Sequence, residues 1–320
     1  MSLPVGLIVN PLSHTVQRKG SVLERVNALV DNALLVRIED FNELPAQLSR
    51  LAAKDVSAVF VEGGDGTLQA VMSAWPGMAA GEAALPDFAI LPGGSTNLAY
   101  KIAGLGQRTA RDVADYISAY GAGRPVKRNS LSALRLEAAA LARPQIGMLL
   151  STGSLARAMI YTQREIHGTG HRGSLAVAEA AARFVFSPET YLDTDNAPLL
   201  RPSELSVESG AVHLRGAHAL SLMSTLPSLS LGLRTFWGEG AGAIALTHAA
   251  WPIGGFRSAF LKILAGTTGP RMAEHGLTSY RTDSLEISCE GAIVLDGELL
   301  QLPANASIRV TPTLPIRFLR

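Results

Sequence analysis

The stretch VEGGDGTLQ, residues 61–69, places one carboxylate in a glycine turn at the start of an expected helix. Such a turn leaves backbone N–H groups pointing outward, and the helix adds the positive end of its dipole, which favours an anion such as phosphate. A carboxylate, here Asp65, is repelled by phosphate alone but attracted by phosphate-bound Mg²⁺. These residues predict a site for a nucleotide polyphosphate and a metal, although a tight turn with a capping Asp or Thr explains the same pattern.

A second turn, LPGGSTNLA at residues 91–99, repeats this layout 30 residues later. Ser95, Thr96 and Asn97 bring hydroxyl and amide groups to the start of the next helix, where they can cap that helix or contact a ligand. In a doubly wound sheet, ligands bind at the carboxyl ends of the strands. Two such turns after successive strands are therefore expected to converge at one edge of the sheet.

Near the other end of the chain, the run DGE at residues 296–298 lies between apolar segments. An alcohol nucleophile needs a general base within hydrogen-bond reach, and a carboxylate such as that of Glu298 can serve. Asp296-Gly297 is also a favoured two-residue hairpin turn. The residues themselves support both interpretations.

The elements that position these motifs alternate between strand and helix over the first 125 residues. Strands separated by helical segments predict a parallel sheet with both faces covered, which makes the N-terminal part an α/β domain with a Rossmann-like sheet. The expected strands are residues 4–10, 33–39, 56–62 and 88–94, and the expected helices are residues 20–32, 40–54, 65–75, 95–104 and 110–120.

The pattern changes near residue 127, and the second half reads as a β-rich, sandwich-like domain. Helical insertions are expected at residues 155–166, 174–186 and 255–266. We expect a nucleotide-binding domain over residues 1–127 and a substrate domain over residues 128–305. Residues from about 306 to 320 are candidates to pack back on the first domain.

Composition limits the function classes. Hydrophobic residues make up 47% of the chain and charged residues 17%, and the net charge of +1 gives no reason to expect nucleic acid as a partner. The single cysteine, Cys289, cannot form an internal disulfide, and no signal peptide or apolar run of membrane-spanning length is present, so a cytoplasmic protein is expected. Residues 251–266 combine aromatic and aliphatic side chains with Arg257 and Lys262, which suits a peripheral contact with the inner membrane face. A helix packed on the second domain explains the same pattern.

Four motifs in this order resemble the diacylglycerol kinase catalytic-domain family: Asn10-Pro11 after the first strand, GGDGT at 63–67, LPGGSTN at 91–97, and DGE at 296–298. That family includes bacterial lipid kinases and sphingosine and ceramide kinases, and is related to NAD kinases. The resemblance spans residue 4 to about residue 318. It implies a two-domain kinase that uses ATP and Mg²⁺, with the ATP in a cleft, and that phosphorylates a lipid hydroxyl such as that of diacylglycerol.

Site residues follow from the resemblance position by position. Asp65 is expected near the metal, Glu298 as the catalytic carboxylate, and Asp296 as its neighbour. The residues expected to bind the cofactor are Asn10, Gly63, Gly64, Asp65, Gly66, Thr67, Leu68, Gln69, Gly94, Ser95, Thr96 and Asn97.

The chain also departs from the family pattern. LSHTVQ at 12–17 replaces the usual Ser-Gly continuation, Leu98 replaces an Asp, and residues 224–246 lack both the Gly-Asn-Gly run and the metal-binding Asp of bacterial lipid kinases. These departures keep two alternatives open. One is a kinase of a soluble substrate related to NAD kinase, and the other is a nucleotide-binding regulator without turnover.

Two further patterns are interpreted as a polar loop. GTGHRG at 168–173 matches the dinucleotide fingerprint but follows a charged, helix-like stretch instead of a strand. His167 and His171 have the spacing of a zinc pair, but the glycines around them argue against a helix.

Overall fold

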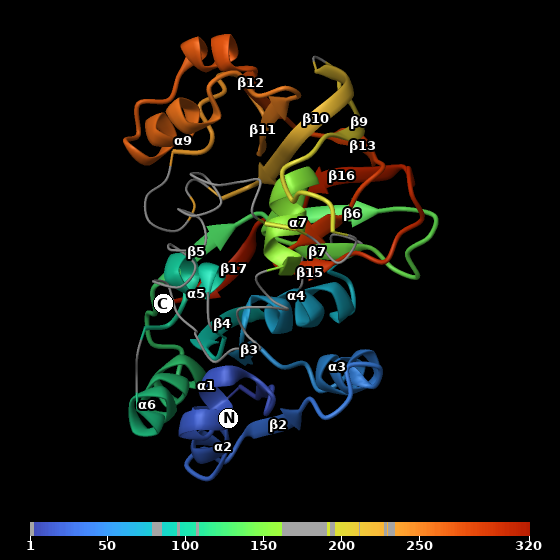
Figure 1. The fold of residues 1–320 in the computed structure, drawn as a ribbon. Helices are drawn as coiled ribbons and strands as arrows, with labels where there is room; N and C mark the ends of the chain where they lie inside the picture. The colour runs from blue at the N-terminus through green and yellow to red at the C-terminus, as the bar shows by residue number, and fades with distance from the viewer. Residues whose placement is uncertain are drawn as a thin grey trace. The chain divides into compact units, whose positions relative to one another are not determined.

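The chain divides into two compact units, which are described separately in this computed structural model. Unit 1 comprises residues 1–132 and 313–320, and unit 2 comprises residues 133–312. Figure 1 shows the elements of both units. The structure describes residues 3–78, 85–94, 97–106, 109–161, 191–192, 196–210, 212–226, 229 and 234–320.

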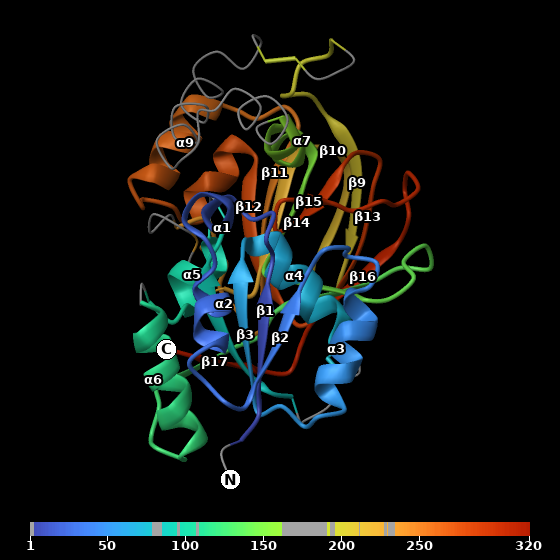
Figure 2. The same cartoon turned by 90° about the horizontal axis from the view of Figure 1, so that it is seen from below.

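Unit 1 is built on one sheet of six strands among the described residues, in the order β2-β1-β3-β4-β17-β5. Strands β1 to β4 and β17 run parallel to their neighbours in that order, and β5 pairs antiparallel with β17. Figure 2 shows β1, β2 and β3 with their arrowheads pointing the same way. The strands are β1 (Val5–Val9), β2 (Ala33–Arg37), β3 (Ala58–Gly63), β4 (Asp87–Pro92), β5 (Arg128–Leu131) and β17 (Ile316–Leu319).

Helices cover both faces of this sheet. Val5, Leu7 and Val9 of β1 pack with residues of α2 and α6 in one core cluster. The intervening Gly6 faces the other side, where a Cβ on it would lie 3.2 Å from Leu51 of α3. The described helices of unit 1 are α1 (His14–Lys19), α2 (Val22–Asn27), α3 (Leu44–Ala52), α4 (Asp65–Ala74), α5 (Leu98–Ala103) and α6 (Ala110–Gly121).

Unit 2 is built on an antiparallel sheet of eleven strands among the described residues. Its main path runs β15-β14-β8-β10-β9-β13-β16-β6-β7, and β11 joins β10 to β12. The strands are β6 (Leu134–Glu137), β7 (Gln145–Gly147), β8 (Leu149–Thr152), β9 (Ser203–Glu208), β10 (His213–Ser224), β11 (Ile244–Ala250), β12 (Leu277–Thr282), β13 (Leu285–Cys289), β14 (Ile293–Leu295), β15 (Glu298–Leu299) and β16 (Ile308–Pro312).

Period-two alternation fixes which face of this sheet is buried. In β9, Leu205 and Val207 are buried while Glu204 and Glu208 are exposed. Equivalent residues of β13 and β16 join the same core cluster. The described helical elements of unit 2 are α7 (Gly153–Tyr161), α9 (Phe256–Leu264) and the 3₁₀ helix η4 (Pro270–His275).

The predicted fold class is confirmed, because a mostly parallel α/β unit is followed by an antiparallel β-rich unit. Helix α1 and strand β12 were not predicted from the sequence. The GTGHRG stretch, His167, His171 and the expected helix at 174–186 lie outside the described residues.

Candidate functional site

The two glycine turns pack directly on each other at the carboxyl ends of strands β3 and β4. The N–H of Gly93 donates to the carbonyl of Gly63 at 2.9 Å. A Cβ built on Gly93 would lie 2.5 Å from the Cα of Gly63, and one built on Gly94 would lie 2.6 Å from the Cα of Gly64. The glycines are therefore required first by the close approach of two backbones.

The loop after β1 is tied to the same edge. The Asn10 amide donates from Nδ2 to Oγ1 of Thr67 at 2.8 Å, and its Oδ1 accepts from the N–H of Leu12 at 3.0 Å. The N–H of Thr15 donates to the carbonyl of Gly93 at 2.8 Å. Three turns that are distant in sequence thus form one connected rim.

Asp65 holds the start of helix α5. Its Oδ2 accepts from the N–H of Leu98 at 2.9 Å, and its Oδ1 accepts from the N–H of Ala99 at 3.0 Å. Burial raises the pKa of Asp65, and this outweighs the opposite effect of the two N–H donors and of the Lys101 charge. The carboxylate that was predicted to act on a metal therefore also links the first glycine turn to the helix after the second.

The second turn is closed by the Asn97 side chain. Asn97 has the left-handed conformation, with φ of 51° and ψ of 50°, which asparagine tolerates better than most residues. Its Oδ1 accepts from the N–H of Gly94 at 2.9 Å, and its Nδ2 donates to the Gly94 carbonyl at 2.6 Å. Ser95 and Thr96, which were predicted to bind the cofactor, lie outside the described residues.

Glu62 is a rim residue that the sequence reading missed. This carboxylate is almost fully buried at the end of β3. It accepts from the hydroxyl of Ser21 at 2.5 Å and from the N–H groups of Val22 and Leu23 at 2.9 and 3.0 Å, so it holds the start of α2. A carboxylate at the end of an otherwise apolar strand was the available signal, since a buried charge needs such partners.

The helices at this rim differ in how their first N–H groups are satisfied. Protein carboxylates accept the first N–H groups of α2 and α5. The ten-residue helix α4 is instead preceded by Gly64 as its N-cap residue, and no side chain caps it. Leu68 and Gln69, two of the predicted cofactor-binding residues, have buried side chains in this helix. Gly66 lies in its half-buried first turn and has no side chain, so a ligand contact of Gly66 would come from its backbone N–H.

In unit 2, Asp296 and Gly297 form the two-residue hairpin turn between β14 and β15, as their dipeptide predicts. Both have positive φ, 50° and 94°. The Asp296 carboxylate accepts from the N–H of Met148 at 2.8 and 3.0 Å and from the N–H of Leu149 at 2.8 Å. Asp296 therefore fastens the turn to the neighbouring strand β8.

Glu298 begins the edge strand β15, opposite Leu295 of β14. Its side chain is exposed, and the carboxylate makes no hydrogen bond or ion pair with the part of the chain that the structure describes. An exposed carboxylate next to an anchored turn can accept a proton. Glu298 and Asp296 lie in unit 2, while Asp65 and the glycine turns lie in unit 1.

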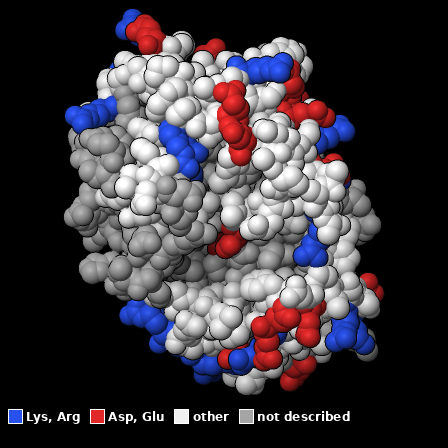
Figure 3. All heavy atoms as spheres, turned by 45° about the vertical axis from the view of Figure 1, so that its right-hand side comes forward, with Lys and Arg blue, Asp and Glu red and all other residues white. Residues whose placement is uncertain are grey.

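Charged side chains do not gather by sign on the face drawn in Figure 3, where described Lys and Arg residues are interspersed with Asp and Glu. Among the described residues, no group of three or more His, Cys, Asp or Glu side chains is placed to hold a metal ion. None of the described helices has both the length and the apolar character that a membrane crossing requires.

Residues 4–126 match the family model for the diacylglycerol kinase catalytic domain. This N-terminal region is therefore similar to a diacylglycerol kinase catalytic domain. The match supports the kinase that the motifs predict, and the matched region contains both glycine turns. No curated protein sequence matches the chain.

Solved structures share the fold of this chain over nearly its whole length. Three are from Bacillus anthracis str. Sterne and are described as diacylglycerol kinases, two of them provisionally. One has a TM-score of 0.66 and 14% sequence identity, with 98% of this chain and 95% of that chain covered. Another has a TM-score of 0.62 and 15% identity, with 97% and 94% covered. At these identities the likeness concerns the fold.

Proposed function

We propose that the chain transfers the γ-phosphate of ATP to the hydroxyl of a lipid such as diacylglycerol. The observation that supports this most directly is the rim of unit 1, where the starts of α2 and α5 are occupied by carboxylates and that of α4 has no side-chain cap. A helix start without a cap, next to glycine turns, suits a phosphate group.

The phosphates would be bound chiefly by backbone groups. The first N–H groups of α4, at Asp65 and Gly66, are the donors of this helix start. Thr67 is almost fully buried and accepts from Asn10, so its role is to hold the loop after β1 against α4. Asn97 keeps the second turn in shape.

Asp65 is the residue that fits Mg²⁺ at this rim. Its two oxygens each accept one backbone N–H, and a carboxylate oxygen has a second acceptor position. Mg²⁺ in phosphoryl-transfer sites is usually bound by one or two carboxylates together with phosphate oxygens and water, so one carboxylate is a sufficient protein contribution. When bound, the ion would neutralise charge on the transferred phosphoryl group.

Glu298 would accept the proton of the attacking hydroxyl. Its side chain is exposed and is not paired with a described residue, so it is available to a substrate. Asp296 would act as a positioning residue, because its bonds to Met148 and Leu149 hold the turn that carries Glu298. The expected contribution of such a base is about 10²–10⁴ in rate.

A lipid acceptor is favoured by helix α9. Leu261 and Leu264 of this helix are each 52% exposed. Arg257 lies four residues before Leu261, so the three side chains share one side of the helix. Apolar side chains flanked by a cation suit a peripheral contact with an anionic membrane surface.

The first experiment is a transfer assay with γ-labelled ATP. Diacylglycerol, sphingosine and ceramide would be offered in mixed micelles, and NAD and glycerol in solution, each with and without Mg²⁺. We expect label in a lipid product only, and only with Mg²⁺. Label in NAD would replace the lipid proposal by the soluble-substrate kinase, and ATP binding without label in any acceptor would favour a regulator without turnover.

A paired variant tests the role of α9. Leu261→Ser with Leu264→Ser should lower sedimentation with vesicles containing anionic lipid by about tenfold, since two exposed apolar side chains contribute about 1–2 kcal/mol to the contact. Leu192→Ser, at a similarly exposed leucine in unit 2, is the matched control. Equal sedimentation of both variants would remove α9 from the membrane contact.

A further inference from the structure

A cavity lies in unit 1 at the amino ends of the parallel strands β3 and β4, whereas the glycine turns lie at their carboxyl ends. It has a volume of about 790 Å³, which is in the range of small-molecule sites. It is lined by Ser57, just before β3, and by Asp87, the first residue of β4. At about 3.3 Å per residue, the length of β4 separates Asp87 from the glycine turn by about 17 Å.

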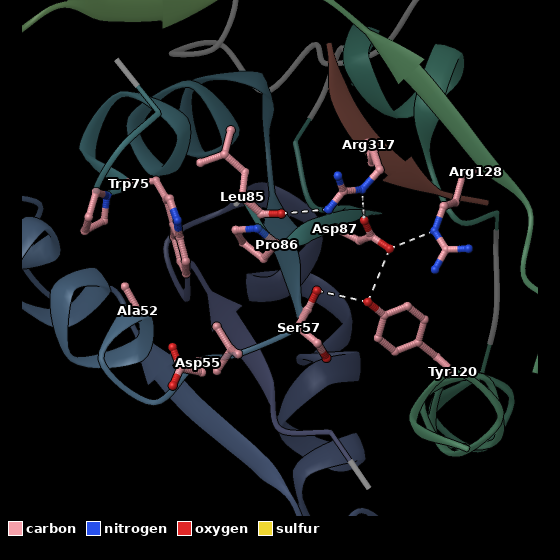
Figure 4. A pocket seen from close by; sticks show the side chains of 12 residues that line it. Ala52, Asp55, Ser57, Trp75, Leu85, Pro86, Asp87, Tyr120, Arg128 and Arg317 are labelled. Carbon is pink, nitrogen blue, oxygen red and sulfur yellow. Dashed lines mark hydrogen bonds and ion pairs between the residues drawn. The ribbon is translucent and has the colours of Figure 1, made fainter. Parts of the chain in front are cut away.

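Two arginines and one carboxylate form the polar wall of this cavity (Figure 4). Arg128 donates from Nε to Oδ2 of Asp87 at 2.8 Å, and Arg317 donates from Nε to Oδ1 at 2.5 Å. The Tyr120 hydroxyl, which has a single proton, lies within donating distance of Oδ2 at 3.2 Å and of the Ser57 carbonyl at 2.9 Å. Burial raises the pKa of Asp87, but the hydrogen bonds and charges of Arg317 and Arg128 more than offset this, so the pKa is below its ordinary value.

The two arginines have more donors than Asp87 can accept. Two guanidinium groups carry about ten N–H donors, while one carboxylate has about four acceptor positions. One further acceptor is the carbonyl of Leu85, which binds Nη2 of Arg317 at 2.8 Å. The side chains of Arg128 and Arg317 remain 44% and 46% exposed, so their remaining donors are within reach of a ligand.

The charge around the arginines is positive. Two guanidinium groups surround one ionised carboxylate, and the other acidic residue of the lining, Asp55, lies across the cavity from them in Figure 4. The rest of the wall is largely apolar and includes Trp75, Leu85 and Pro86. The cavity therefore combines an anion-recognising end with an apolar side.

We propose that this cavity binds a small amphipathic anion, with a phosphate or carboxylate group at Arg128 and Arg317 and an apolar body against Trp75 and Pro86. Guanidinium groups match both kinds of anion in geometry. The site is separate from the proposed ATP site, because it lies at the amino ends of the strands and the glycine turns lie at the carboxyl ends. Its ligand would bind together with the nucleotide.

The test is calorimetric titration of the full chain with three probes: octyl phosphate, octanoate and inorganic phosphate. We expect one of the two octyl anions to bind with one-to-one stoichiometry, also in the presence of saturating ATP. Inorganic phosphate should bind at least about tenfold more weakly, because it lacks the apolar body. Comparison of octyl phosphate with octanoate identifies the preferred head group.

Arg128→Gln should weaken this binding by at least about tenfold, which is the usual effect of losing a charge-assisted hydrogen bond. Arg124→Gln makes the same charge change at an exposed position outside the cavity lining and should leave the affinity within about twofold. If Arg128→Gln does not fold, Arg128→Lys keeps the charge and should still weaken binding, because lysine lacks the planar guanidinium group that binds an anion through two N–H donors at once. Equal affinity in all variants, or binding of none of the probes, would overturn the proposal.

Discussion

The two glycine–aspartate turns of the molecule use the same residue types in different ways. In unit 1, the backbone at Gly63 and Gly64 leaves no room for a Cβ on the facing glycines of the second turn, and Asp65 reaches a helix start 33 residues further on. In unit 2, Gly297 is needed for its positive φ, and Asp296 reaches a strand junction 148 residues earlier. Both aspartates bind backbone N–H groups, whereas Glu298 does not bind a described residue.

This difference separates residues that shape a site from a residue that is free to react. An aspartate whose oxygens already accept N–H groups holds a turn in place, and only its remaining acceptor positions are open to a ligand such as the proposed Mg²⁺. A carboxylate without such partners keeps its full capacity to accept a proton. The variants below test that distinction, and the first has the largest expected effect.

Glu298→Gln should lower kcat by about 10²–10⁴ while leaving the free energy of unfolding within about 0.5 kcal/mol, because the side chain is exposed. Steady-state phosphoryl transfer and urea unfolding measure the two quantities. Glu286→Gln, on an exposed position of β13, is the control and should leave both unchanged. Full turnover of Glu298→Gln would remove Glu298 as the base.

Gly93→Ala should destabilise unit 1 by about 2–3 kcal/mol, because the added Cβ meets the backbone of Gly63 at 2.5 Å and neither backbone can move alone. Gly147→Ala, beside the other turn, should cost only about 1 kcal/mol. Its Cβ would meet the Asp296 and Leu295 side chains at 2.6 Å, and side chains can shift. Urea unfolding of both variants gives the order, and a larger cost at Gly147 would contradict the comparison.

Acid should destabilise unit 2 through two stacked imidazoles, His218 and His248, whose ring centroids lie 6.0 Å apart. Burial, and then the charge of His218, lowers the pKa of His248 from 6.5 to about 4. The unfolded chain therefore binds more protons between these values, so this stability is complete above about pH 6.5 and is lost as the pH falls through 4. The loss is on the order of 3 kcal/mol.

Tryptophan fluorescence can assign that loss to one unit. With Trp75→Phe, the remaining Trp237 and Trp251 report on unit 2 alone. His248→Gln should flatten the dependence of unfolding on pH between 6.5 and 4, whereas His213→Gln, at an exposed imidazole, should not. An unchanged slope in His248→Gln would assign the titration to other groups.

Asp65→Asn and Asp296→Asn should each cost about 1–2 kcal/mol of stability, since each replaces a charged acceptor of two backbone N–H groups by a neutral one. Their functional effects should differ. Asp65→Asn should weaken Mg²⁺-dependent ATP binding, and Asp296→Asn should lower kcat with little change in ATP affinity. Asp115→Asn, at an exposed position of α6, is the control for both.

Local patterns predicted strands β1 to β4, the helices that follow them and the glycine turns, because the period of apolar residues and the glycine positions act over a few residues. They did not predict α1 or β12. The partners of Asp65 and Asp296 could not be predicted, because they lie far away in sequence and depend on tertiary packing. The role of Glu62 was missed for the same reason, since its partners are 39 to 41 residues earlier.

The cavity at Asp87 was equally inaccessible from sequence. Arg128 and Arg317 are 41 and 230 residues away from Asp87, and no short motif joins them. Only the placement of β17 between β4 and β5 brings Arg317 to the carboxylate.

That placement of β17 has a consequence for synthesis. Strand β17 is made last, yet it lies inside the sheet of the first unit and separates β4 from β5. A ribosome must therefore translate through Leu319 before the sheet of unit 1 can be completed. The unit that is begun first is thus finished last. Until then, the edge of β4 is an unpaired template that a chaperone or a neighbouring nascent chain can reach.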